Sequence, residues 1–77
     1  MNLKEILADI ARAIVDDPNS VNVTEETDGD DITLTLSVAE ADTGMVIGRH
    51  GKIANAIRAI MKVAANREGK HVTVEIK

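Results

Sequence analysis

The stretch MVIGRHGKIANAIRAI, residues 45–60, joins two apolar segments through a short basic loop that lies between two glycines. Apolar residues continue up to Ile47 and resume at Ile53, so both flanks are expected to be buried. The residues between them favour water or an anion, and they are Gly48, Arg49, His50, Gly51 and Lys52. What this loop binds depends on the elements on either side of it.

The beginning of the chain has the pattern of an amphipathic helix. Asn2 can cap its start, with Glu5 three positions later as a capping-box partner. Pro18 disfavours helical geometry at the preceding residue, so the helix is predicted to end near Asp16. The apolar residues expected to face the core follow helical spacing and are Leu3, Ile6, Leu7, Ile10, Ala11 and Ile14.

Three segments alternate between apolar and polar residues, as half-buried strands do. The first is short, residues 21–24, and the second covers residues 32–38. Asp28-Gly29 between them is a strong hairpin signal, because glycine readily takes the positive φ of a tight turn. The third segment covers residues 72–76.

Two further helices are predicted to flank the basic loop. The shorter covers residues 41–47, with Asp42 as its N-cap. The longer runs from Ile53 to about Arg67, and Gly69 stops it as a C-cap would. The apolar stripe of the longer helix consists of Ile53, Ala56, Ile57, Ile60, Met61 and Ala64.

This order, α-β-β-α-α-β, predicts a two-layer α+β fold in a single domain over residues 1–77. The first two strands form an antiparallel hairpin. The helix pair provides a crossover that returns the last strand parallel to the second strand. We therefore expect three helices packed on one face of a three-stranded mixed sheet.

Composition excludes several classes of function. The chain has no cysteine, so it contains no disulfide, thiolate metal site or cysteine nucleophile. It has no Phe, Tyr or Trp, so it cannot stack nucleic-acid bases on aromatic rings. No apolar run approaches the roughly 20 residues that span a bilayer. We therefore expect a soluble, cytoplasmic protein with no membrane partner.

The net charge of −4 conceals an uneven distribution of charge. Residues 1–47 contain eleven acidic and two basic side chains, whereas residues 48–71 contain six basic side chains and one acidic one. The sequence therefore predicts a basic region on an acidic body. Such a region is either a solvated helix face or a surface that binds an anion.

The glycine pair does not match the common nucleotide-binding loops. A Walker A loop would need glycine in place of Val46 and a hydroxyl residue in place of Ile53. A dinucleotide-binding loop would follow a strand, whereas this loop follows a predicted helix. The remaining arrangement is helix-G-x-x-G-helix. Its spacing alone fits either a plain corner between two helices or an anion site.

An anion site has a physical basis in this loop. Gly48 can end the first helix in a left-handed conformation and, lacking Cβ, lets another backbone approach closely. Gly51 stands at the entrance of the second helix, whose free N–H groups and positive dipole end attract anions. Arg49 and Lys52 add positive charge at the same point.

No other group of residues indicates catalysis or a cofactor. His50 and His71 are the only histidines, and no carboxylates have the spacing to complete a metal site with them. Asp28, Asp30 and Asp31 lack the later glutamate of a calcium loop, so a solvated turn is expected. No nucleophile–base pair is visible. We therefore expect a protein that is not an enzyme and that uses no metal or cofactor.

The segment VIGRHGKIANAIRAI resembles the signature of KH domains, in which V-I-G-x-x-G-x-x-I joins two helices and clamps single-stranded nucleic acid. The whole chain is similar to the small stand-alone bacterial KH proteins of the KhpA type, which have the type II order α-β-β-α-α-β. The resemblance implies that the G-x-x-G backbone grips about four unpaired nucleotides. The residues that it assigns to RNA binding are Gly44, Val46, Ile47, Gly48, Arg49, His50, Gly51, Lys52, Ile53, Ile57 and Arg58.

The resemblance implies an RNA chaperone or post-transcriptional regulator whose partner is single-stranded RNA, with single-stranded DNA as a further partner. It also implies a homodimer, or a heterodimer with a larger KH-containing protein. Two copies of a weak grip would raise avidity without new contacts. The alternative is a protein-interaction module that uses the acidic face of a KH fold and has little RNA affinity of its own.

Overall fold

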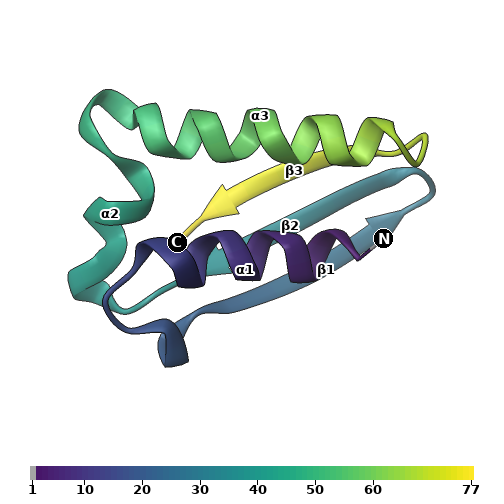
Figure 1. Cartoon of the computed structure of the whole chain (residues 1–77). Helices are drawn as coiled ribbons and strands as arrows, with labels where there is room; N and C mark the ends of the chain where they lie inside the picture. The colour runs from purple at the N-terminus through teal and green to yellow at the C-terminus, as the bar shows by residue number, and fades with distance from the viewer. Residues whose placement is uncertain (1) are drawn as a thin grey trace.

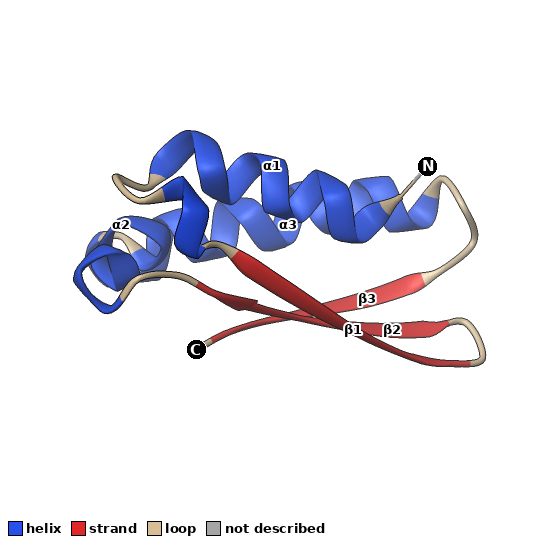
Figure 2. Ribbon diagram, turned by 90° about the horizontal axis from the view of Figure 1, so that it is seen from below, coloured by secondary structure: helices blue, strands red, loops and turns tan. Residues whose placement is uncertain are grey.

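The computed structural model describes residues 2–77 as two layers, with the helices on one face of a sheet (Figure 2). The helices are α1 (Leu3–Ile14), α2 (Thr43–Ile47) and α3 (Lys52–Asn66), and the strands are β1 (Asn22–Asp28), β2 (Asp31–Ser37) and β3 (His71–Ile76). The predicted α+β class and element order are confirmed. Within the described range, no helix is long and apolar enough to cross a membrane.

The sheet has the order β1-β2-β3, so β2 is central and β3 lies at an edge. β1 and β2 are antiparallel, and β2 and β3 are parallel, as predicted. α3 packs along β3, and α1 lies beside it over β1 and β2 (Figure 1). This arrangement places the loop between α2 and α3 at one end of the molecule and the β1–β2 turn at the other.

β1 is longer than the predicted strand, because it extends to Asp28 although Val23 is its one buried residue. Its polar second half lacks the apolar alternation by which a strand is predicted from sequence, and it is held by pairing with β2 along its whole length. The turn consists of Gly29 and Asp30, one residue later than predicted, and Gly29 has a φ of +64°.

α1 begins as predicted and ends slightly earlier. The side-chain oxygen of Asn2 accepts a hydrogen bond from the Glu5 amide at 3.2 Å, which caps the helix. The helix ends at Ile14 rather than near Asp16. α1 and α3 enclose the core against the inner face of the sheet, and the largest fully buried side chains are Leu7, Leu34, Leu36, Met61 and Val46.

The buried face of α3 differs from the predicted stripe. The prediction placed Ile53, Ala56 and Ile60 toward the core, but all three are exposed, Ile60 at 52%. Apolar residues occupy most positions around this helix, so their spacing could not identify the inner face. A helix on a sheet buries one side only, and here the buried row is Ala54, Ile57, Met61 and Ala65. The two alanines in this row allow the helix to approach the sheet closely.

Asp42 has a role that its place in the sequence did not reveal. The sequence predicts an N-cap, but the side chain makes no capping hydrogen bond to α2. Its carboxylate instead accepts a hydrogen bond from the backbone amide of Asp17 at 3.0 Å. Asp42 is only 3% exposed, so this bond gives a buried carboxylate a partner. It joins the segment after α1 to the start of α2 and thereby helps to place the loop that follows.

Gly69 ends α3 as predicted. It has a φ of +68°, and its amide donates to the carbonyl of Asn66 at 3.1 Å. The amide of Lys70 donates to the carbonyl of Ala65 at 3.0 Å. This pair of hydrogen bonds is the Schellman motif, which satisfies carbonyls that a helix end would otherwise leave unpaired. The chain then turns into β3.

Candidate nucleic-acid interface

The basic loop is a tight turn in which three residues have positive φ. The amide of Gly48 donates to the carbonyl of Gly44 at 2.9 Å and so ends α2. Gly48 has a φ of 75° and a ψ of 172°, a combination open essentially to glycine alone. The predicted left-handed conformation is found instead at Gly51, with a φ of 75° and a ψ of 13°. His50 is left-handed as well, with a φ of 58°, and histidine is among the residues that tolerate this region.

Gly48 lies against a side chain rather than against another backbone. A Cβ atom on Gly48 would lie 2.6 Å from Cγ1 of Ile53 and 3.0 Å from its Cβ, so any larger residue would require Ile53 to move. Gly51 differs, because the nearest atom to a Cβ there would be Nδ2 of Asn55, at an ordinary 3.9 Å. Gly48 is therefore required by both its dihedral angles and its surroundings, and Gly51 by its φ.

The backbone of the loop leaves two amides open to an anion. The amide of Gly51 donates to the carbonyl of Gly48 at 3.2 Å, and the amide of Lys52 donates to the carbonyl of Arg49. The amides of Arg49 and His50 have no hydrogen-bond acceptor among residues 2–77. Arg49 is right-handed and His50 left-handed, an alternation in which successive amides converge on an anion. The positive end of the α3 dipole lies directly behind them.

The polar side chains of the loop are open to solvent. Arg49, His50 and Lys52 are all exposed. Neither Arg49 nor Lys52 forms an ion pair within the described part of the chain, whose ion pairs lie elsewhere, between Arg12 and Asp9 and between Lys70 and Asp30. The positive charge of the loop is therefore not neutralised by an ion pair within the described part of the chain.

The apolar residues assigned to the site fall into two groups. Val46 and Ile57 are 0% and 2% exposed, so they belong to the core and cannot contact a ligand directly. Ile47 and Ile53 are more than a third exposed beside the loop, and Gly44 is exposed on α2. Of the apolar residues assigned to the site, Gly44, Ile47 and Ile53 therefore remain candidates for direct contact with RNA. Val46 and Ile57 support the loop from the core.

Arg58 is anchored rather than free. Its Nε donates to the backbone carbonyl of Val74 at 3.1 Å, and its Nη1 donates to Oδ1 of Asn55 at 3.4 Å. The hydrogen bond between Arg58 and Asn55 was not predicted from the sequence. The spacing could have predicted it. Asn55 follows Gly51 by four positions and precedes Arg58 by three, and residues three or four apart are neighbours on a helix surface.

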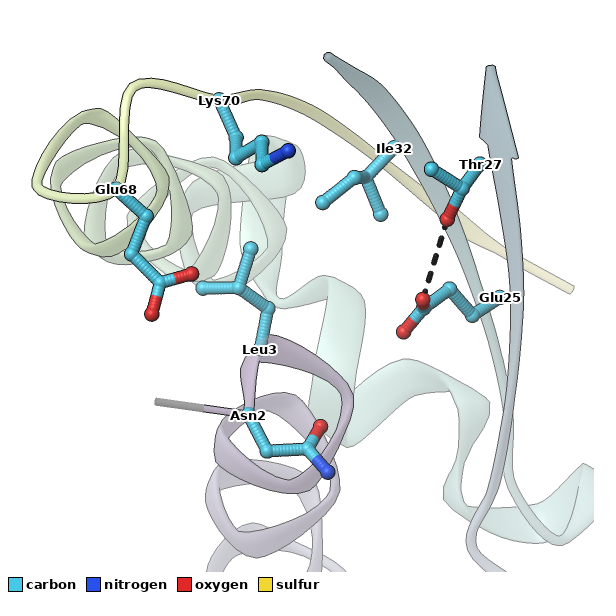
Figure 3. A pocket seen from close by; sticks show the side chains of 7 residues that line it. All are labelled: Asn2, Leu3, Glu25, Thr27, Ile32, Glu68 and Lys70. Atoms are coloured by element: carbon cyan, nitrogen blue, oxygen red, sulfur yellow. Dashed lines mark hydrogen bonds between the residues drawn. The ribbon is translucent and has the colours of Figure 1, made fainter. Parts of the chain in front are cut away.

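A separate hollow of about 410 Å³ lies near the opposite end of the molecule, between the start of α1, the β1–β2 hairpin and the end of α3 (Figure 3). Its lining residues are Asn2, Leu3, Glu25, Thr27, Ile32, Glu68 and Lys70. The hydroxyl of Thr27 donates to the carboxylate of Glu25 at 3.2 Å. Because the two glutamates would repel phosphate, the hollow is a poor site for nucleic acid. Nor does the described range contain three or more His, Asp or Glu residues grouped to hold a metal ion.

Comparison with known proteins agrees with this geometry. The family model described as KhpA/KhpB, KH domain, matches residues 4–76. The chain is 49% identical to the RNA-binding protein KhpA of Clostridium acetobutylicum over 74 residues, which cover 96% of this chain and 99% of the relative. It is 41% identical to the RNA-binding protein KhpA of Treponema pallidum, over 95% of this chain and 91% of the relative.

Two solved structures share the fold. A crystal structure of Aquifex aeolicus Era bound to GDP and AlF4⁻ matches with a TM-score of 0.69 at 22% identity. A crystal structure of Era in complex with MgGDPNP and a segment of 16S ribosomal RNA matches with a TM-score of 0.68 at 18% identity. Both matches cover 96% of this chain but only 29% and 28% of those chains, so they show the fold alone. The family model and the full-length relatives go further than the fold: the chain belongs to the KhpA/KhpB family of KH domains.

Proposed function

We propose that this protein binds single-stranded RNA at the loop formed by residues 48–52. The observation that carries the proposal is the pair of free amides at Arg49 and His50, which lie at the positive end of α3 among exposed cationic side chains. The relatives named RNA-binding protein KhpA support the same assignment. Backbone amides can hold phosphates without aromatic rings, which the chain lacks. Single-stranded DNA carries the same phosphates and is a further partner.

A single loop of this size makes few contacts, so we propose that the protein acts as a homodimer, or as a heterodimer with a larger KH-containing protein. Two linked loops would raise avidity without a new contact. The support comes from α3, where Ile60 and Val63 are 52% and 63% exposed and lie one turn apart. Exposed apolar side chains grouped in this way are typical of contact surfaces between proteins.

We further propose that the cellular role is that of an RNA chaperone or post-transcriptional regulator in the cytoplasm, where unpaired transcripts are available. Binding rather than catalysis is the activity that the loop supports, because it offers hydrogen-bond donors and positive charge but no nucleophile–base pair. An exposed site that binds a short unpaired segment suits such a role, because the RNA can bind and dissociate readily.

Fluorescence anisotropy with a labelled, unstructured RNA tests the proposed function. We expect saturable binding that is stronger for unpaired RNA than for a hairpin duplex. Binding should weaken with salt along a shallow slope, because few phosphates fit the loop and few counterions are released. A folded protein that binds neither RNA would contradict the proposal and would favour an interaction module that uses the acidic surface. A preference for duplex would show that the basic residues act in another way.

A further inference from the structure

A line of hydrogen-bonded groups runs from the edge of the sheet to Asn55, whose side chain lies beside the basic loop. The amide of His71 donates to the carbonyl of Asp30, just before β2, and the amide of Lys77 donates to the carbonyl of Leu36, near the end of β2. Backbone groups of alternate residues point to the same side of a strand, so the carbonyl of Val74 lies on the outer edge of β3. Arg58 donates to this carbonyl through Nε and to Asn55 through Nη1. The guanidinium is thereby fixed between the sheet edge and the first turns of α3.

Arg58 also fixes the orientation of the Asn55 side chain. A guanidinium can only donate hydrogen bonds, so the atom of Asn55 that faces it must be the amide oxygen, Oδ1. The amide nitrogen, Nδ2, consequently points the other way. A Cβ atom on Gly51 would lie 3.9 Å from this nitrogen, which places Nδ2 beside the loop.

The Nδ2 group of Asn55 has no acceptor among residues 2–77, and the residue is exposed. Asparagine is a poor helix former compared with alanine or lysine, because its side chain competes for backbone hydrogen bonds. Helix stability therefore gives no reason for an asparagine at this place. A donor that is held in position and left without an acceptor is instead suited to a ligand.

The geometry points to Asn55 as a further RNA contact of this loop and to Arg58 as the positioning residue that aims it, an inference that rests on the proposed function. Asn55 donates a hydrogen bond to an acceptor on a nucleotide held by the loop, either a phosphate oxygen or a base carbonyl. Arg58 acts through Asn55 and through Val74, and keeps the loop, α3 and β3 in a fixed relation. The site therefore extends from the loop along one side of α3 toward β3.

The variant Asn55→Asp tests the contact, because it keeps the acceptor that Arg58 uses and replaces the donor with an anionic oxygen. The control is Asn66→Asp, which makes the same change of charge at the last residue of α3. Binding of labelled U, A and C oligoribonucleotides is measured by anisotropy. We expect Asn55→Asp to weaken binding about tenfold or more and Asn66→Asp to leave it near the wild-type value. An equal loss on all three RNAs assigns the acceptor to phosphate, and a loss that depends on the base assigns it to the base.

The role of Arg58 is tested by a double-mutant cycle with Asn55→Ala and Arg58→Lys. Lysine keeps the positive charge but cannot hold Val74 and Asn55 together with a planar fork. If Arg58 acts through Asn55, the loss in the double variant is smaller than the product of the two single losses. Independent losses would overturn the positioning role. If the wild type and Asn55→Asp bind RNA equally well, the proposed contact at Asn55 is wrong, but the proposed function stands. If the wild type does not bind RNA, the proposed function is wrong as well.

Discussion

Ile53 fills the space beside Gly48 so completely that a Cβ atom on this glycine would lie 2.6 Å from Ile53 Cγ1. Gly48 directly follows α2, and Ile53 lies in the first turn of α3. The contact therefore closes the turn between the two helices. The shape of the loop therefore depends on the absence of a side chain at Gly48, because the side chain of Ile53 occupies that space.

Gly48→Ala should therefore lower the free energy of unfolding by about 3 kcal/mol or more, because backbone strain of about 1–3 kcal/mol adds to the clash with Ile53. Ile53→Ala removes the 2.6 Å clash with Cγ1, but it leaves the tight 3.0 Å contact with the Cβ of residue 53 and the backbone strain. In urea denaturation, the double variant should be at least about 1 kcal/mol more stable than the sum of the single losses predicts. Additive losses would show that the backbone alone requires the glycine.

Gly51 and Gly69 form a matched pair for separating chain geometry from ligand approach. Both have positive φ, 75° and 68°, and a Cβ atom would clash at neither. Replacing either with alanine should cost about 1–2 kcal/mol of stability. We expect RNA affinity to fall for Gly51→Ala only, since Gly69 lies at the other end of α3. Proportional loss of stability and binding in both variants would mean that the glycines of the loop only shape the chain.

Asp42→Ala should destabilise the protein by about 1–3 kcal/mol, because the amide of Asp17 loses its acceptor in a partly buried place. Asp42→Asn keeps an acceptor oxygen and should recover most of this loss. Thermal denaturation followed by circular dichroism measures both. A similar loss in the two variants would indicate that the negative charge, rather than the hydrogen bond, stabilises this junction.

Ile60→Glu tests the proposed dimer surface. Ile60 is 52% exposed, so the folded monomer should change in stability by no more than about 0.5 kcal/mol. Sedimentation equilibrium should show self-association of the wild type and its loss in the variant. The control is Ala13→Glu at an exposed position of α1. A variant that associates as well as the wild type would contradict the assignment of this surface, and a wild type that stays monomeric at all concentrations would contradict the homodimer.

The fold could be predicted largely from local patterns, because each element has an apolar period that matches its geometry. The second strand illustrates this: Ile32, Leu34 and Leu36 alternate in the sequence and are all buried. Two of the predictions that differ from the structure concern segments where local pattern carries no information. The second half of β1 is defined by its partner strand. The inner face of α3 is selected by the sheet beneath it, because the apolar residues of this helix spread well beyond the row that is buried.

The loop itself was identified from its glycines and charges, but its internal geometry was not. The contact between Gly48 and Ile53 depends on a ψ of 172° that no spacing rule supplies. The hydrogen bond from Asp17 to Asp42 and the one from Arg58 to Val74 join residues that are distant in sequence. Such contacts depend on how the helices and strands pack together, so local sequence patterns cannot predict them.

RNA binding by the loop is tested most directly by comparing two variants of equal charge. Arg49→Asp combined with His50→Asp places two carboxylates at the free amides of the loop, and Arg12→Asp combined with His71→Asp makes the same substitutions at exposed positions on α1 and β3. Anisotropy with a labelled single-stranded RNA is measured for both, with circular dichroism to verify folding. We predict that the loop variant loses about tenfold or more in affinity while the control stays near the wild type. A folded loop variant that binds RNA as tightly as the wild type would show that the loop is not the RNA-binding site.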